Sequence, residues 1–159
     1  MVSVSLTMLE ESLEKKIRIM ALIEEENEKQ QKVLSNYEEV DEEAFDETID
    51  RKSDLIDQLL ALDDGFETLF ERVKEEIGEN KTQYSDQIKR MQVLIKEITA
   101  KSASIEAKEH RNKKLAEKYF SAAREHMNQS RSSSSAAFNY YQTMNNFKNI
   151  PPQFMDKKN

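Results

Sequence analysis

Between Tyr84 and His126, mostly apolar side chains recur at steps of three and four residues without a break. Such steps return to one face of an α-helix, so the pattern predicts a single long helix with one buried face. The alternation resembles a heptad repeat sustained over about six heptads. A helix of about 45 residues would be ~65 Å long, so we expect it to overhang shorter partners and leave part of its apolar face uncovered. The seam positions are Tyr84, Ile88, Met91, Ile95, Ile98, Ser102, Ile105, Glu109, Asn112, Ala116, Tyr119, Ala123 and His126.

Two more helices are predicted upstream. The first runs from about Leu6 to Asn36, and the second runs from an N-cap at Asp41 to Ile77, where Gly78 suits a C-cap. Gly65 lies inside the second pattern, but the apolar stripe resumes in phase, so we expect an intact helix with at most a local kink. With only two Gly and two Pro in 159 residues, the chain has few turn formers and favours long helices.

The expected fold is therefore all-α: an antiparallel bundle or coiled coil of three long helices plus a short C-terminal helix. We expect residues 1–131 to form the long-helix bundle. Residues 132–159 would be a serine-linked amphipathic segment with a flexible tail.

Polar residues interrupt the apolar stripes of all three long helices. If the helices run antiparallel, Asn27, Lys52 and Glu109 come within about one turn of one another. We expect a buried or half-buried Lys52–Glu109 ion pair, with Asn27 or Asn112 completing the hydrogen bonds, because long charged residues are seldom buried unless paired. Three independent, solvated side chains are the alternative.

The segment after Ser132–Ser135 holds five of the twelve aromatic residues of the chain. A short helix is predicted from about Ser135 to Asn149, ended by Pro151-Pro152. That much aromatic surface either folds back on the bundle or is offered to a partner. With the overhanging seam of the third helix, it would form an apolar groove that accepts an amphipathic helix. The residues expected to bind such a partner are Phe138, Tyr140, Tyr141, Met144, Phe147, Tyr119 and Ala123.

Several classes of function lack their residues. The chain has no Cys, and its two histidines, His110 and His126, are 16 positions apart on one predicted helix, roughly 24 Å, too far to share a metal. Neither follows a Glu three positions earlier, as a di-iron bundle requires. No phosphate-binding or zinc-protease motif occurs, so we expect no enzyme, no cofactor and no metal. No segment approaches the ~18 apolar residues of a membrane span, which favours a cytoplasmic protein.

Charge is distributed unevenly along the chain. Residues 1–80 carry a net charge of −15 and residues 81–159 a net charge of +8. Because the acidic part would lie within about a Debye length of the basic part, we expect no nucleic-acid partner.

The chain resembles the FlgN family of flagellar type III export chaperones over nearly its whole length. The resemblance begins at Glu26-Asn27 and at 49–52 with Leu55-Ile56. It ends at the acidic-then-basic tail 154–158, while Pro151-Pro152 and the double tyrosine depart from the family pattern. The other matching positions are Phe66, Phe70, Arg72, Val73, Tyr84, Ile88, Met91, Gln92, Leu94, Ile95, Ile98, Thr99, Ser102, Ile105, Glu109 and Asn112.

The resemblance implies a chaperone that binds the C-terminal helical segments of hook–filament junction proteins of the FlgK and FlgL type. It would prevent their premature assembly and deliver them to the export gate protein FlhA. A tyrosine in the C-terminal segment would dock on the gate, and Tyr140 and Tyr141 are the matching candidates. Two alternatives stay open: a structural coiled-coil or adaptor protein that forms a homodimer through the third helix, and a sibling chaperone of the FliT type with a different client.

Overall fold

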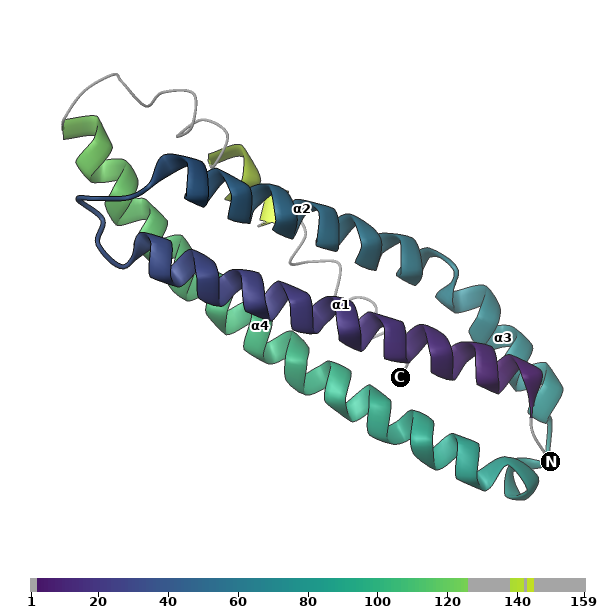
Figure 1. The fold of residues 1–159 in the computed structure, drawn as a ribbon. Coiled ribbons are helices and arrows are strands. Elements are labelled where there is room, and N and C mark those ends of the chain that lie inside the picture. The colour runs from purple at the N-terminus through teal and green to yellow at the C-terminus, as the bar shows by residue number, and fades with distance from the viewer. Residues whose placement is uncertain (1–2, 126–137, 142, 145–159) are drawn as a thin grey trace. The chain divides into compact units, whose positions relative to one another are not determined.

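The computed structural model describes residues 3–125, 138–141 and 143–144. Within these residues every regular element is helical (Figure 1). The elements are α1 (Val4–Leu34), α2 (Glu42–Asp64), α3 (Phe66–Ile77), the 3-10 helix η1 (Lys81–Tyr84) and α4 (Ser85–Glu125). The all-α class expected from the sequence is confirmed for this part of the chain. None of the described helices is long and apolar enough to cross a membrane.

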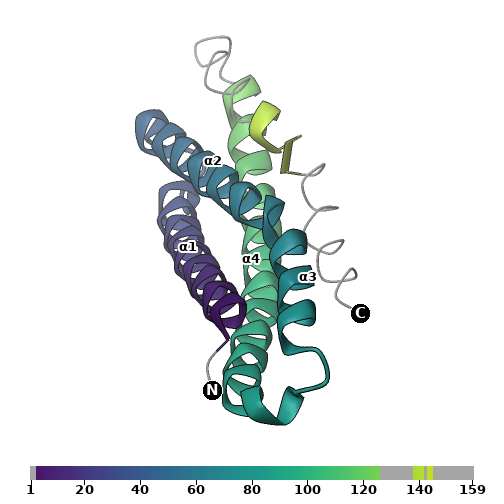
Figure 2. The same cartoon turned by 90° about the vertical axis from the view of Figure 1, so that its right-hand side faces the viewer.

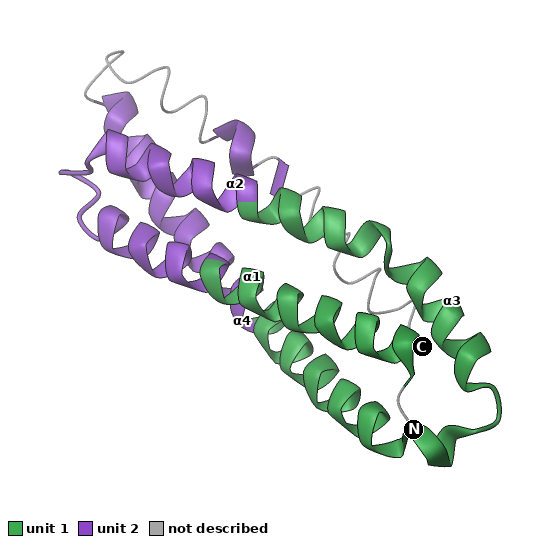
Figure 3. Ribbon diagram, turned by 45° about the vertical axis from the view of Figure 1, so that its right-hand side comes forward, with its two compact units in different colours: residues 1–22, 55–103 green, residues 23–54, 104–159 purple. Residues whose placement is uncertain are grey.

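The chain forms two compact units, and each is assembled from two separate stretches of sequence (Figure 3). Unit 1 comprises residues 1–22 and 55–103, and unit 2 comprises residues 23–54 and 104–159. The helices α1, α2 and α4 each contribute one part to each unit. The domain boundary expected at residues 131 and 132 lies outside the described residues.

Within unit 1, α1 runs parallel to α4 and antiparallel to the α2–α3 stretch. The start of α1 meets the start of α4, where the Ser3 backbone N–H donates to Gln87 Oε1 at 2.9 Å. Further along both helices, Arg90 Nε donates to Glu10 Oε1 at 2.7 Å. The antiparallel α2–α3 stretch is joined to α1 by an ion pair, in which Lys16 Nζ lies 2.8 Å from Asp63 Oδ1.

Within unit 2, α1 again runs parallel to α4 and antiparallel to α2. Asn112 Nδ2 of α4 donates to the backbone oxygen of Asn27 in α1 at 2.9 Å. Its apolar end is an aromatic cluster in which Phe45 is fully buried. The Phe45 ring meets Tyr119 edge-on at 5.7 Å, and Phe120 lies 6.2 Å away. Edge-to-face rings add about 0.5–1.5 kcal/mol beyond their burial.

The helix ends follow local chemistry. Asp41 caps α2 as predicted, because its Oδ1 accepts the Ala44 backbone N–H at 3.2 Å. At the other turn Gly78 has a φ of 54° and donates its N–H to the Lys74 carbonyl at 2.9 Å. Glycine adopts a positive φ without steric cost, and Gly78 is the C-cap of α3, as predicted.

Two expectations about the helices are wrong. The second helix is broken at Gly65 into α2 and α3 rather than continuing. The break is consistent with glycine being a weak helix former beside Asp63 and Asp64, two residues that also favour turns. The seam of α4 is not left uncovered either, because every predicted position from Tyr84 to Ala123 is buried or half-buried. His126 lies outside the described residues.

Candidate functional site

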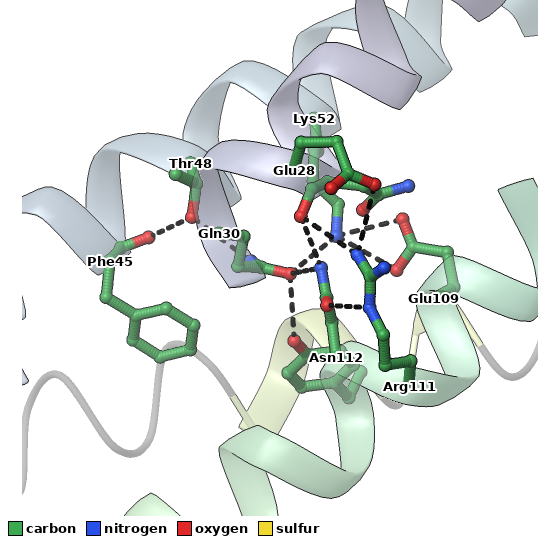
Figure 4. Close-up of polar contacts among 10 residues, drawn as sticks. Glu28, Gln30, Phe45, Thr48, Lys52, Glu109, Arg111 and Asn112 are labelled. Carbon is green, nitrogen blue, oxygen red and sulfur yellow. Dashed lines mark hydrogen bonds and ion pairs between the residues drawn. The ribbon is translucent and has the colours of Figure 1, made fainter. Parts of the chain in front are cut away.

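A buried polar cluster in unit 2 brings together side chains from α1, α2 and α4 (Figure 4). Lys52 of α2 stands at its centre with a fully buried side chain. Its ammonium lies 2.8 Å from Glu109 Oε1 and donates to Glu109 Oε2 at 2.9 Å. It also donates to Gln30 Oε1 at 2.9 Å. The ion pair expected from the sequence is therefore formed, at the expected level of the helices.

The hydrogen-bond partner of Lys52 is not the one expected. Gln30 reaches the ammonium, whereas Asn112 bonds to Gln30 Oε1 at 3.1 Å and to the Asn27 backbone. The Asn27 side-chain amide is fully buried, and neither its nitrogen nor its oxygen has a hydrogen-bond partner within the described residues. Thr48 fixes the Gln30 amide by accepting from Nε2 at 3.1 Å. Antiparallel levels predict which turns meet, but side-chain reach decides which atoms bond.

Burial and charge act on Lys52 in opposite directions. Burial lowers the pKa of the Lys52 ammonium, and the Glu109 carboxylate opposes that shift. A charge inside a protein is stable only with a partner at close range, which Glu109 supplies. Removing either member alone would leave the other charged and buried.

The described part of the C-terminal segment packs on this cluster. In Figure 2 it lies beside the part of α4 that belongs to unit 2. Tyr140, Tyr141 and Met144 are buried, while Phe138 is 57% exposed. The Tyr141 hydroxyl donates to Gln30 Oε1 at 3.3 Å. The Tyr140 ring centroid lies 5.0 Å from Lys52 Nζ. A helical segment remote in sequence thus closes the polar cluster on one side.

Burial of the two tyrosines changes the pKa values of their hydroxyls. Burial raises the pKa of Tyr140 well above its usual value, and the nearby charge of Glu109 raises it further. The pKa of Tyr141 is raised for the same two reasons. The docked segment therefore holds both phenols in their neutral form.

The remaining predicted client-binding residues are distributed differently. Tyr119 is buried against Phe45, and Ala123 is half-buried further along α4. Phe147 lies outside the described residues. The residues that the structure brings together are Tyr140, Tyr141 and Met144, with Lys52, Gln30 and Glu109 near the two tyrosines.

A neighbouring group of ion pairs surrounds Glu26, whose side chain is buried. Glu26 Oε1 lies 3.1 Å from Lys29 Nζ and 3.6 Å from Arg51 Nη1, while its Oε2 is buried without a hydrogen bond in the described part. Further ion pairs join α1 to α4, including Lys108 Nζ with Glu24 Oε2 at 3.0 Å. Among the described residues no group of three or more His, Asp or Glu side chains could hold a metal ion.

No family model matches the chain, and neither the curated proteins nor the solved structures contain a match.

Proposed function

We propose that this protein is a cytoplasmic export chaperone for flagellar subunits, of the kind that the FlgN resemblance implies. Its clients would be the C-terminal helical segments of hook–filament junction proteins of the FlgK and FlgL type. The chaperone would keep the clients unassembled and pass them to the export gate protein FlhA. It would act by binding, without catalysis.

One observation carries this proposal. Within unit 2, a short helical segment that is not part of α1, α2 or α4 is docked on these helices with Tyr140, Tyr141 and Met144 buried. It contacts side chains of α1 and α2 through Gln30 and Lys52. The surface beneath it is therefore complementary to an amphipathic helix, which is the chemistry of helix-in-groove recognition.

The docked segment also supplies a mechanism for release and delivery. In the free chaperone, the segment shields the surface from solvent. A client helix would displace it and would free Tyr140 and Tyr141, the residues proposed to dock on FlhA. Binding that must also order a client segment costs ~2–5 kcal/mol of the gross interaction energy, which keeps the complex releasable.

Calorimetry tests the proposal directly. A peptide from the C-terminus of the FlgK-type subunit encoded in the same genome is titrated into the full-length chain and into its Tyr140→Ser/Tyr141→Ser variant. If the segment leaves the site in about a tenth of free molecules, removing its anchors strengthens binding about tenfold, because apparent affinity scales with the open fraction.

A matched control lies on the same segment. Phe138 is exposed, so Phe138→Ser should leave the affinity for the peptide unchanged. If the peptide binds to none of the three proteins, junction-subunit chaperoning is wrong. If Phe138→Ser has the same effect as the double substitution, the segment acts through an exposed contact and not by shielding the site.

A further inference from the structure

The ammonium of Lys52 lies close to three different groups. Gln30 Oε1 lies at 2.9 Å, the two Glu109 oxygens lie at 2.8 and 2.9 Å, and the Tyr140 ring centroid lies at 5.0 Å. A lysine ammonium has three N–H donors and accepts no hydrogen bond. The face of an aromatic ring attracts a cation within about 6 Å of its centroid. The face of the Tyr140 ring is therefore a further partner of the ammonium, in addition to its oxygen partners.

The two neighbouring tyrosines use different parts of their side chains. The Tyr141 hydroxyl donates to Gln30 at 3.3 Å. The Tyr140 hydroxyl is buried and has no hydrogen-bond partner within the described residues. A buried hydroxyl without a partner is unfavourable. Position 140 therefore contributes the face of its ring, and its hydroxyl adds nothing to docking.

Desolvation strengthens this contact. Lys52 is fully buried, and Tyr140 is 6% exposed. Attraction between a cation and a ring is larger where water is excluded. The oxygen partners hold the ammonium in place from α1 and α4, so its position does not depend on the docked segment alone.

We infer that Lys52 is the specificity-determining residue of this docking site and selects helices that lay an aromatic ring over its ammonium. The inference rests on the proposed function for the identity of the client. A client segment would carry Phe or Tyr at the position of Tyr140 and an apolar side chain four residues later, where this chain has Met144. An aliphatic residue of similar size at the ring position would be discriminated against.

The test uses the full-length chain with residue 140 replaced by phenylalanine, 4-fluorophenylalanine, trifluorophenylalanine and pentafluorophenylalanine. Fluorination keeps the ring's shape but makes its face progressively less negative. Docking is measured as hydrogen-exchange protection of the segment amides. We expect protection to be equal or higher for Tyr140→Phe and then to fall stepwise, by about tenfold or more at pentafluorophenylalanine. These replacements leave α1, α2 and α4 untouched, so misfolding of the bundle cannot produce the trend.

Equal protection across the fluorinated series would overturn the inference, since apolar burial alone would then explain docking. A lower protection for Tyr140→Phe than for tyrosine would also contradict it, because the hydroxyl would then matter. Tyr141→Phe is the companion variant, and it should lose protection because it removes the bond to Gln30.

A client arm separates this inference from the proposed function. Junction-subunit peptides with their aromatic residues changed singly to leucine are titrated into the wild-type chain and into Lys52→Met/Glu109→Leu. One leucine substitution should weaken binding about tenfold in the wild type and have little effect in the double variant. If no peptide binds, the proposed function fails, while the fluorinated series still decides how the chain's own segment is recognised. If peptides bind but no aromatic matters, Lys52 does not select the client.

Discussion

Among the described residues, Lys52 and Glu109 form the most deeply buried ion pair, with side-chain exposures of 0% and 4%. A buried pair of this kind adds little net stability compared with apolar side chains, but losing one partner is costly. Its role is to fix which turns of α1, α2 and α4 face one another, because Gln30 and Asn112 are tied to the same centre.

A double-mutant cycle tests this coupling. We expect Lys52→Met to lower the free energy of unfolding by about 3–5 kcal/mol, because Glu109 is left charged and buried. The Lys52→Met/Glu109→Leu variant should lose clearly less. Urea unfolding of the wild type, both single variants and the double variant supplies the four free energies. Additive losses would show that the pair is not coupled.

The burial of these tyrosines predicts that the folded chain loses stability at alkaline pH. Burial raises the pKa of Tyr119 to about 12, and the pKa values of Tyr140 and Tyr141 are raised as well. A raised folded-state pKa stabilises the fold below the unfolded value of about 10 and loses that effect as the pH rises.

Absorbance at 295 nm against pH measures this effect. Part of the phenolate signal should appear only well above pH 10, and together with unfolding or release of the segment. Tyr140→Phe/Tyr141→Phe should reduce that late part. A guanidinium-unfolded sample is the control, and it should titrate near 10. A native titration that overlays the unfolded one would refute the expectation.

At the scale of elements, the start of α1 depends on a residue far along the chain. Ser3 caps the helix through its Oγ, which accepts the Leu6 N–H at 3.1 Å. Glu76 adds a second cap, because its carboxylate accepts the Val4 N–H at 2.8 Å and the Ser5 N–H at 3.1 Å. An anion at a helix N-terminus also interacts favourably with the helix dipole.

Hydrogen bonds from the side chains of Ser5 and Ser3 lower the pKa of Glu76 most, and the backbone N–H groups of Ser5 and Val4 lower it further. The cap should therefore be fully effective above the unfolded pKa of about 4.3 and be lost as the pH falls through the lower folded value. Glu76→Gln should speed hydrogen exchange at Val4 and Ser5. It should also make the protection of these two amides less dependent on pH, because glutamine carries no charge. Glu75→Gln, at the exposed neighbouring residue, is the control. Equal exchange in both variants would exclude capping by Glu76.

The two glycines should respond in opposite ways to alanine. A Cβ at Gly65 would meet nothing within 4 Å, and its φ of −91° suits any residue. Gly65→Ala should raise the free energy of unfolding by about 0.4–1 kcal/mol by restricting the unfolded chain. Gly78 has a φ of 54°, so Gly78→Ala should be destabilising. Thermal unfolding of both variants measures the contrast, and a loss at Gly65 would mean that the break between α2 and α3 needs glycine.

Periodicity predicted the helices well, because burial of one face is encoded in steps of three and four. Leu6, Leu9 and Leu13 are buried as the pattern requires, and so are Ile49 and Ile56. The Lys52–Glu109 pair could be predicted from levels in an antiparallel bundle. The Glu76 cap could not, since no capping box follows Ser3 and the anion comes from another helix. The Tyr141–Gln30 bond spans 111 positions, and only the aromatic density of the segment hinted at docking.

At the scale of the molecule, binding and folding are linked. A client that binds the folded chain but not the unfolded chain should stabilise it by about 2.7 kcal/mol at a hundred times its dissociation constant. Urea unfolding of the full-length chain with and without the junction-subunit peptide measures this gain. A peptide with its apolar positions changed to serine is the control. An unchanged midpoint with the unmodified peptide would contradict specific binding to the folded chaperone.

The division into units has a consequence for how the chain is made. Each unit joins an early stretch of sequence to a late one: residues 1–22 with 55–103, and residues 23–54 with 104–159. A nascent chain that has reached residue 80 holds pieces of both units and completes neither. Each unit includes part of α4. The earlier half of α4 must therefore leave the ribosome before unit 1 can form, and the later half must leave it before unit 2 can form. The first 80 residues therefore emerge before either unit can close, and their net charge of −15 would help to keep their apolar side chains from associating during synthesis.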